Sequence, residues 1–331
     1  MRAHPVLLGA RMNRTAIIPA FLALVALGCG GSTATVGEDG GTESGGGSVS
    51  ADQAASDAAQ AYCQRAEACA PAYVSIGFGD VGTCEQRLKQ ELLPVFGANG
   101  SSSTPGQTES CAQAIPQMTC ADLLARKNPT PCQTLPGMLA DGAACGADSQ
   151  CHGTRCRVAS DALCGTCTEP APAGAACGVD ADCQPGMTCL DGSCTQYGNE
   201  GAACSTTQPC RPDLGCVGGA CGAPSPTGTA CQATAECDLM HGYACHPVSM
   251  TCQPFTFAQA NGTCGLVNNS LVLCAGPGSL CKGAQAPSYE GNCVPFAMDG
   301  AGCDADAGPL CEVGAVCSGG TCQVPNPVNC H

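Results

Sequence analysis

The sequence is poor in the residues that fill an apolar core. Among its 331 residues there is no Trp, there are five Tyr and six Phe, and charged residues make up 12%. No stretch alternates strands with helices as a barrel or Rossmann enzyme would. The chain holds 33 cysteines instead. This composition excludes a large hydrophobic interior and indicates a protein held together by covalent cross-links.

Motifs for catalysis are missing as well. The sequence contains no G-x-S-x-G elbow, no HExxH and no phosphate-binding loop, and its five His residues are isolated. The 12 Lys and Arg are too few and too scattered against 27 Asp and Glu for a nucleic-acid partner. We therefore expect a protein that is not an enzyme, with no catalytic residue, no metal and no cofactor.

Residues 1–28 have the features of a signal peptide. Three arginines precede an apolar run that is too short to span a bilayer. Met12 is an alternative to Met1 as the translation start, because the segment after it is a complete signal. The run ends in ALGC at residues 26–29, which resembles the lipobox of bacterial lipoproteins. The resemblance implies lipidation of Cys29; cleavage by the ordinary signal peptidase is the alternative.

Lipidation of Cys29 would leave an even number of cysteines, 32, for disulfides. Residues 29–50 continue with Gly, Ser and Thr, which form a flexible tether of about 25 Å. We expect an exported protein that is lipid-anchored to the outer membrane or cell surface. Its contact with the membrane would be through the lipid on Cys29 alone.

Residues 51–138 predict a small α-helical domain of four short helices. Asp80 is placed to cap one of them. Apolar residues recur at helical spacing on two faces: Ala55, Ala59, Tyr62, Ala66 and Cys69, and then Leu88, Leu92 and Val95. The domain has six cysteines: Cys63, Cys69, Cys84, Cys111, Cys120 and Cys132. They predict three disulfides, and the fifteen pairings that six cysteines allow stay open.

Residues 139–331 lose the helical pattern and contain internal repeats. A unit that opens with GAAC or a variant recurs about six times, at intervals of 32, 27, 27, 33 and 39 residues. Two further cysteines of this region, Cys164 and Cys330, are additional to the four-cysteine pattern of the units. Each unit carries four cysteines: Cys145, Cys151, Cys156 and Cys167; Cys177, Cys183, Cys189 and Cys194; Cys204, Cys210, Cys216 and Cys221; Cys231, Cys237, Cys245 and Cys252; Cys264, Cys274, Cys281 and Cys293; Cys303, Cys311, Cys317 and Cys322.

The units predict small disulfide-rich repeats with little regular secondary structure. Each should form a short β-ribbon, because Gly-rich turns such as DGSC at Cys194 return the chain sharply. Of the three pairings in a unit, we predict first to third and second to fourth. Stacking of one copy on the next predicts an elongated array that follows the helical domain.

The strings GVDADCQPGMTCLDGSC (residues 178–194) and PLCEVGAVCSGGTC (residues 309–322) resemble the amino-terminal cysteine-rich domain of Dickkopf proteins and short EGF-like modules. The resemblance covers about 180 residues, and the longer Dickkopf spacing is absent. It implies an extracellular binding or spacer module.

Three local patterns have both a chemical and a structural interpretation. The pairs Asp180/Asp182 and Asp304/Asp306 suit calcium, but the other ligands of a calcium loop are missing, so we expect turn residues. The spacing of Cys237, His241, Cys245 and His246 suits zinc, but export favours disulfides. Cys164 and Cys167 form a CxxC without the following helix that lowers a thiol pKa, so disulfides are again expected.

The favoured function is a non-enzymatic, surface-exposed or periplasm-facing lipoprotein that presents a disulfide-stapled binding or structural rod, for adhesion, recognition or envelope structure. The partner would be an extracellular protein or an envelope component, which the sequence does not identify. One alternative is a protease inhibitor that uses the long loop at residues 282–290. Another is a calcium-dependent binding module.

Overall fold

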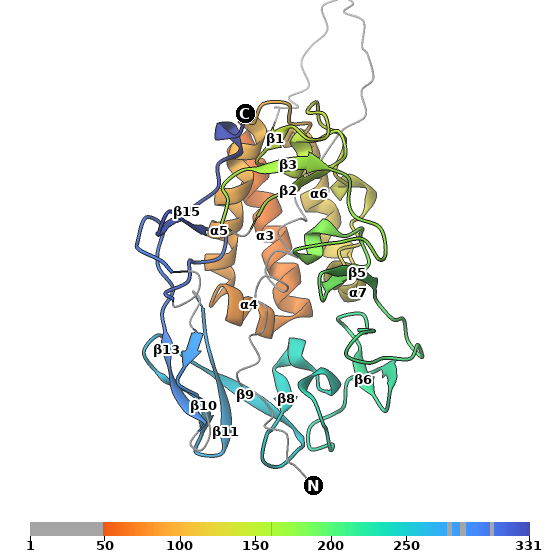
Figure 1. Ribbon diagram of the computed structural model, residues 1–331, viewed down its shortest axis with the longest axis vertical. Coiled ribbons are helices and arrows are strands. Elements are labelled where there is room, and N and C mark those ends of the chain that lie inside the picture. Colours follow the sequence, from red (N-terminus) through yellow and green to blue (C-terminus); the bar gives the residue numbers. More distant parts are fainter. Residues whose placement is uncertain (1–48, 160, 277–279, 285–288, 305–307) are drawn as a thin grey trace, which may run out of the picture.

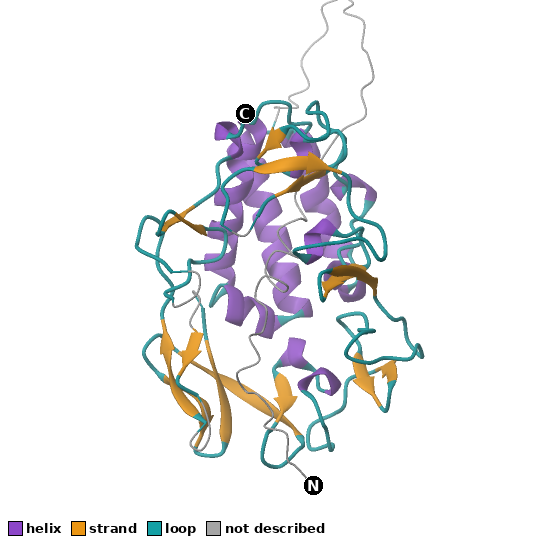
Figure 2. Ribbon diagram, in the orientation of Figure 1, coloured by secondary structure: helices purple, strands orange, loops and turns teal. Residues whose placement is uncertain are grey.

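The computed structural model describes residues 49–331 except residue 160 and the segments 277–279, 285–288 and 305–307. It combines a bundle of helices with many short strands, linked by sixteen disulfides (Figures 1 and 2). So many disulfides indicate that the chain folds in an oxidising, exported environment. Within the described part, no helix has the length and apolar character needed to cross a membrane.

The bundle forms the amino-terminal part of the described chain. Its elements are α3 (Ala51–Cys69), α4 (Pro71–Gly77), α5 (Val81–Leu92), η1 (Leu93–Gly97), α6 (Pro105–Ala114), η2 (Ile115–Gln117), α7 (Cys120–Leu124) and η3 (Thr130–Cys132). The predicted cap is confirmed, because Asp80 accepts a hydrogen bond of 2.7 Å from the Thr83 amide at the start of α5. Helix α4 was not predicted. It is seven residues long, and Pro71 begins it.

The predicted apolar faces are confirmed. Every residue assigned to them is buried, and most belong to one cluster between α3, α5 and α6. Three disulfides cross this cluster: Cys63–Cys84, Cys69–Cys120 and Cys111–Cys132. They tie α3 to α5, α3 to α7 and α6 to η3. Because the apolar side chains in this cluster are small, the three disulfides provide much of what holds the helices together.

The predicted pairing within the repeats is confirmed in all six units. First and third cysteines are bonded, as are second and fourth, for example Cys177–Cys189 and Cys183–Cys194. In each unit the third and fourth cysteines lie opposite each other on a β-ribbon. The two disulfides therefore fasten that ribbon to the segment that precedes it.

The strands are short. They are β1 (Ala144–Cys145), β2 (Arg155–Arg157), β3 (Gly165–Thr168), β4 (Met187–Leu190), β5 (Ser193–Gln196), β6 (Gly215–Val217), β7 (Ala220–Gly222), β8 (Tyr243–Cys245), β9 (Cys252–Ala258), β10 (Thr263–Val267), β11 (Ser270–Cys274), β12 (Leu280–Lys282), β13 (Glu290–Val294), β14 (Val316–Ser318) and β15 (Thr321–Gln323). Short 3-10 turns, η4 (Asp148–Gln150), η5 (Asp180–Asp182), η6 (Thr234–Glu236), η7 (Leu239–His241) and η8 (Pro327–Asn329), lie between them.

The fourth and fifth repeats depart from one ribbon per unit. They share a six-stranded sheet in the order β12-β13-β10-β11-β9-β8. Strand β9 continues beyond Cys252 and pairs in parallel with β11 of the next repeat. The reason is apolar packing, since Phe255 on β9 and Leu271 on β11 bury their side chains together against Ala72 of the bundle.

The elongated array that we expected is not what the structure shows. The repeats curve around the bundle, and the last strands return toward the first (Figure 1). A disulfide between Cys164 and Cys330, 166 residues apart, links the first repeat to the carboxyl end. Several repeats bury apolar groups on the bundle and not only on each other; Val313 of the sixth repeat belongs to the bundle's own cluster. We call this curved array the belt.

Candidate functional site

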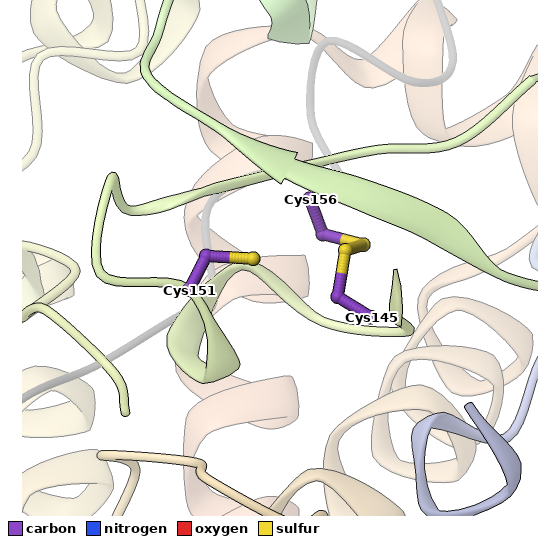
Figure 3. A group of neighbouring side chains, drawn as sticks. All are labelled: Cys145, Cys151 and Cys156. Carbon is purple, nitrogen blue, oxygen red and sulfur yellow. A yellow bond between two sulfur atoms is a disulfide. The ribbon is translucent and has the colours of Figure 1, made fainter. Parts of the chain in front are cut away.

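Groups of three cysteine sulfurs lie within 4.8 Å of one another in at least five of the repeats, close enough to suggest a metal site. Each group is made by two neighbouring disulfides. Figure 3 shows the sulfurs of Cys145 and Cys156 bonded to each other, with Cys151 beside them. The partner of Cys151 is Cys167. These sulfurs are not thiolates, so they do not provide metal ligands.

The four residues whose spacing suits zinc are engaged in other bonds: the two cysteines in disulfides and the two histidines in hydrogen bonds. Cys237 is bonded to Cys252 and Cys245 to Cys231. His241 contacts the carboxylate of Asp238 at 2.8 Å. His246 is fully buried, its Nδ1 accepts from the Ser249 amide, and its Nε2 lies 3.3 Å from the Asn269 carbonyl. The two histidines are therefore held by contacts within the fourth repeat and, for His246, with the fifth repeat.

The two cysteines of the CxxC motif are not bonded to each other. Cys164 is bonded to Cys330, and Cys167 is bonded to Cys151. The two cysteines of the motif therefore belong to different cross-links, as the disulfide interpretation predicted. Neither is a free thiol of the kind that thiol exchange chemistry requires.

The carboxylates of Asp180 and Asp182 are occupied by the repeat's own donors. Asp180 Oδ1 accepts from the Cys189 amide at 2.7 Å and from the Thr188 hydroxyl. Asp182 Oδ2 accepts from the Gly178 amide at 2.8 Å, and its Oδ1 binds Arg155. A calcium ion would have to displace these bonds, so the geometry favours the turn interpretation.

Three sequence predictions fall outside the described residues. Cys29 and the signal peptide precede residue 49, and Asp306 lies in the segment 305–307. The loop proposed for protease inhibition contains the segment 285–288.

A buried charged network joins the first two repeats to the bundle. Arg155 contacts Asp148 at 3.3 Å and Asp182 at 3.0 Å, and all three side chains are at most 12% exposed. Burial alone would raise the pKa of Asp182, but bonds from Gly178 and Arg155 outweigh it and lower that pKa. Burial raises the pKa of Asp180 despite its hydrogen bonds.

Arg126 reaches this network from the end of α7. It follows the helix with a φ of +57°, a conformation that favours glycine. The amides of Arg126 and Lys127 close the helix on the carbonyls of Leu123 and Asp122, as in a Schellman motif. The Arg126 guanidinium then donates to the Met187 carbonyl of the second repeat. Burial lowers the pKa of Arg126.

Beside Arg126 lies an open crevice of about 90 Å³ between the bundle and the second and third repeats. The Gly186 amide donates to the Ala125 carbonyl at 3.0 Å, which joins its two walls. Two cations line it, one from the end of α7 and one from the third repeat. The lining residues are Ala125, Lys127, Pro185, Gly186, Met187, Gln196, Tyr197, Asn199 and Arg211.

A second charged contact fastens the sixth repeat to α5. Arg87 donates to the Val313 carbonyl at 2.7 Å and pairs with Asp299 at 2.7 Å. The bond from Arg87 lowers the pKa of Asp299. One turn further along α5, burial raises the pKa of Glu91 to about 8, although Arg87 opposes the shift.

No family model, curated protein or solved structure matches this chain. The similarity of the repeats to Dickkopf and EGF-like modules therefore has no support beyond the strings quoted above. The crevice and the charged contacts were not predicted. Their residues lie far apart in the sequence and follow no motif; only the concentration of bases signals them, since five of the nine Lys and Arg after residue 28 lie between Arg126 and Arg211.

Proposed function

We propose that this protein is an exported lipoprotein without enzymatic activity, which presents its disulfide-stapled belt outside the membrane for binding or for envelope structure. The observation that carries the proposal is the belt itself. Sixteen disulfides occupy 32 cysteines, and one of them closes the belt on the first repeat. A surface fixed at such a density of cross-links is suited to recognition outside the cell, where proteases and denaturing conditions act.

The place at which the tether would join the described chain, the start of α3, supports presentation away from the membrane. Asp52, at the start of α3, pairs with Lys89 near the end of α5, so the two helix ends lie together. That end of α5 runs into η1, which packs on η8 beside the carboxyl terminus. The sheet of the fourth and fifth repeats lies at the opposite end of the molecule (Figure 1). A lipid at Cys29, joined through the flexible tether to the start of α3, would leave this sheet free to face outward.

The anchor is tested by mass spectrometry of the protein isolated from its native membrane. We expect a chain that begins at Cys29 with a diacylglycerol thioether and that gains 32 alkylated cysteines only after reduction. Cys29→Ser should release the protein from the membrane fraction. An unmodified amino terminus, or a Cys29→Ser protein that stays with the membrane, contradicts the anchor.

The binding role is tested on intact cells. Protease treatment and cross-linking from outside should reach the sheet of the fourth and fifth repeats and recover a partner. A lysate treated in the same way serves as the control for cell leakage. Protection of the belt in intact cells, together with an absence of cross-linked partners, contradicts the proposal. Turnover of a substrate by the purified protein would contradict its non-enzymatic part.

A further inference from the structure

Three large apolar side chains are exposed at the end of the molecule where the tether would join it. Met138 is 81% exposed, the highest value among the large apolar side chains of the described residues. Leu93, at the start of η1, and Val328, in η8, are exposed as well. Burying these side chains against a partner would be favourable, because it removes apolar surface from water.

Contacts between their segments bring the three residues to one place. The Met138 amide donates to the Gly100 carbonyl at 2.9 Å. A Cβ at Gly97 would lie 3.8 Å from Cγ2 of Val328. Gly97 ends the 3-10 turn that Leu93 begins, and Gly100 follows three residues later. Single exposed apolar side chains are ordinary, whereas a group of them marks a contact surface. We call Leu93, Met138 and Val328 the tether-side patch.

The segments that form the tether-side patch carry no Asp, Glu, Lys or Arg. They are residues 92–108, 128–140 and 313–331. The whole sequence is acidic, with 27 Asp and Glu against 12 Lys and Arg. Asp141 follows the second segment, and Lys89, one helical turn before Leu93, pairs with Asp52 at 2.8 Å. An anionic lipid surface repels an acidic protein, and the patch avoids much of that repulsion.

The tether determines which surface lies near the patch. Asp52 is in the first turn of α3, so its pair with Lys89 puts the start of α3 beside the patch. Residues 30–50 join this point to Cys29 and span about 25 Å on average as a random coil. A lipid on Cys29 therefore keeps the patch within reach of the bilayer. A short flexible linker gives a millimolar effective concentration, at which a weak apolar contact suffices.

The opposite end of the molecule lacks this neighbour. Val248 is 64% exposed on the turn between β8 and β9, and the segment 242–281 around it also has no Asp, Glu, Lys or Arg. This turn belongs to the sheet that lies opposite the carboxyl terminus (Figure 1). Both ends share apolar exposure and lack of charge, and the tether distinguishes them.

We propose that the tether-side patch docks on the bilayer that holds the lipid of Cys29. Leu93, Met138 and Val328 enter the interfacial layer and form an apolar, non-covalent contact there. This contact orients the molecule, with the bundle end on the membrane and the sheet of the fourth and fifth repeats facing outward. The inference rests on the lipid anchor proposed above and adds a second contact with the membrane to it.

The test uses fluorescence, because the sequence has no Trp and a single introduced Trp reports its own surroundings. The full lipidated chain is reconstituted in phosphatidylcholine vesicles in which part of the lipid is brominated on its acyl chains. The emission of Met138→Trp should shift to the blue and be quenched several-fold more than that of Val248→Trp, the matched control at the opposite end. Equal quenching of the two variants, or none in Met138→Trp, overturns the proposal.

A charge placed in the patch separates docking from the effect of the tether. In Leu93→Trp/Met138→Asp, quenching should fall to the level of Val248→Trp, because a carboxylate disfavours apolar surroundings. Leu93→Trp/Val248→Asp should be quenched as strongly as Leu93→Trp. Mass spectrometry should find sixteen disulfides in each variant, which excludes misfolding as the cause. Unchanged quenching in Leu93→Trp/Met138→Asp overturns the patch.

Two further results would identify another cause. A dimer of the soluble Cys29→Ser chain that Met138→Asp dissociates, measured by analytical ultracentrifugation, would show that a second copy covers the patch, and it overturns docking on lipid. An unmodified amino terminus in mass spectrometry would remove the anchor and this inference with it. A lipidated chain whose Met138→Trp and Val248→Trp variants respond alike would remove the patch and leave the anchor.

Discussion

The carboxyl group of Glu91 on helix α5 lies against Gly314 of the sixth repeat, so closely that a Cβ at residue 314 would overlap its Oε1 atom. This oxygen is buried and has no hydrogen-bond partner in the described structure. Gly314 has a φ of +88°, which L side chains rarely adopt. The sixth repeat, at one end of the belt, therefore packs against the bundle at the carboxyl group of Glu91, which burial keeps protonated.

Replacement of Glu91 by Gln should change how stability depends on pH. The folded pKa of about 8 lies above the unfolded value, so the folded state holds a proton that the unfolded state loses between pH 4.5 and 8. Stability of the wild type should therefore fall as pH rises through this range and then level off. Glu91→Gln should be more stable than the wild type at pH 9 by about 2–4 kcal/mol.

Guanidinium unfolding with the disulfides intact, at pH 5 and pH 9, measures this difference. Glu200→Gln, at an exposed loop position, is the control and should follow the wild type. The same pH dependence in wild type and Glu91→Gln would contradict a buried, protonated Glu91.

Gly314→Ala should lower the free energy of unfolding for two reasons, the positive φ at this position and the contact with Glu91. We expect a loss of about 2–4 kcal/mol in unfolding free energy. Gly320→Ala is a matched control in the same repeat, because its φ is +78° but nothing lies within 4 Å of the position that a Cβ would take there. It should lose about 1 kcal/mol. Equal losses would mean that the Glu91 contact contributes nothing.

Opening the belt should loosen its carboxyl end without unfolding the repeats. In Cys164→Ser/Cys330→Ser the longest disulfide loop is lost, and we expect a loss of about 2–4 kcal/mol. The segment after β15 should become sensitive to protease, since Cys330 is its only covalent attachment. Mass spectrometry should still find fifteen disulfides. Unchanged proteolysis would show that η8 and η1 hold this end without the bond.

Arg155→Met should destabilise the junction of the first two repeats by about 3–5 kcal/mol, because it leaves buried carboxylates unpaired. Arg157→Met is the control; its side chain is 49% exposed, so its pair with Asp182 should contribute less than about 1 kcal/mol. The lowered pKa of Asp182 adds a pH signature, because the stability from that ionised group is lost in acid.

Thermal unfolding between pH 3 and pH 7 measures this signature. On acidification, Arg155→Met should lose less stability than the wild type loses. At pH 7, Arg155→Met/Asp182→Asn should recover part of the stability that Arg155→Met alone has lost. No recovery in the double variant would contradict the pairing of the two side chains.

Local features of this fold were predictable from the sequence. The cap at Asp80 and the buried face of α3 follow from residues within one or two helical turns of each other. The four-cysteine unit that contains Cys177 was predictable because neighbouring copies repeat the same spacing, but spacing alone does not select Cys189 as its partner from the three possible pairings. Such features depend on short segments and are seen directly in the order of residues.

Most long-range features were not predictable. Cys164 and Cys330 are left as partners only when all other cysteines pair within the helical domain and the units, and nothing near Arg87 indicates Asp299. The parallel pairing of β9 with β11 depends on where Phe255 meets Ala72 of the bundle. The curvature of the belt is the sum of these contacts. Each one forms only when segments far apart in the chain have already come together.

Cys189 lies directly opposite Cys194 on the ribbon of the second repeat, yet each is bonded elsewhere. A newly exported chain that forms this ribbon first has its two nearest thiols facing each other. A bond between them would close a tiny ring and leave the other two cysteines of the unit without their partners. Such a bond has to be broken by thiol–disulfide exchange before the native pairs can form, so a unit whose ribbon forms before its cross-links depends on reshuffling of sulfur bonds during maturation.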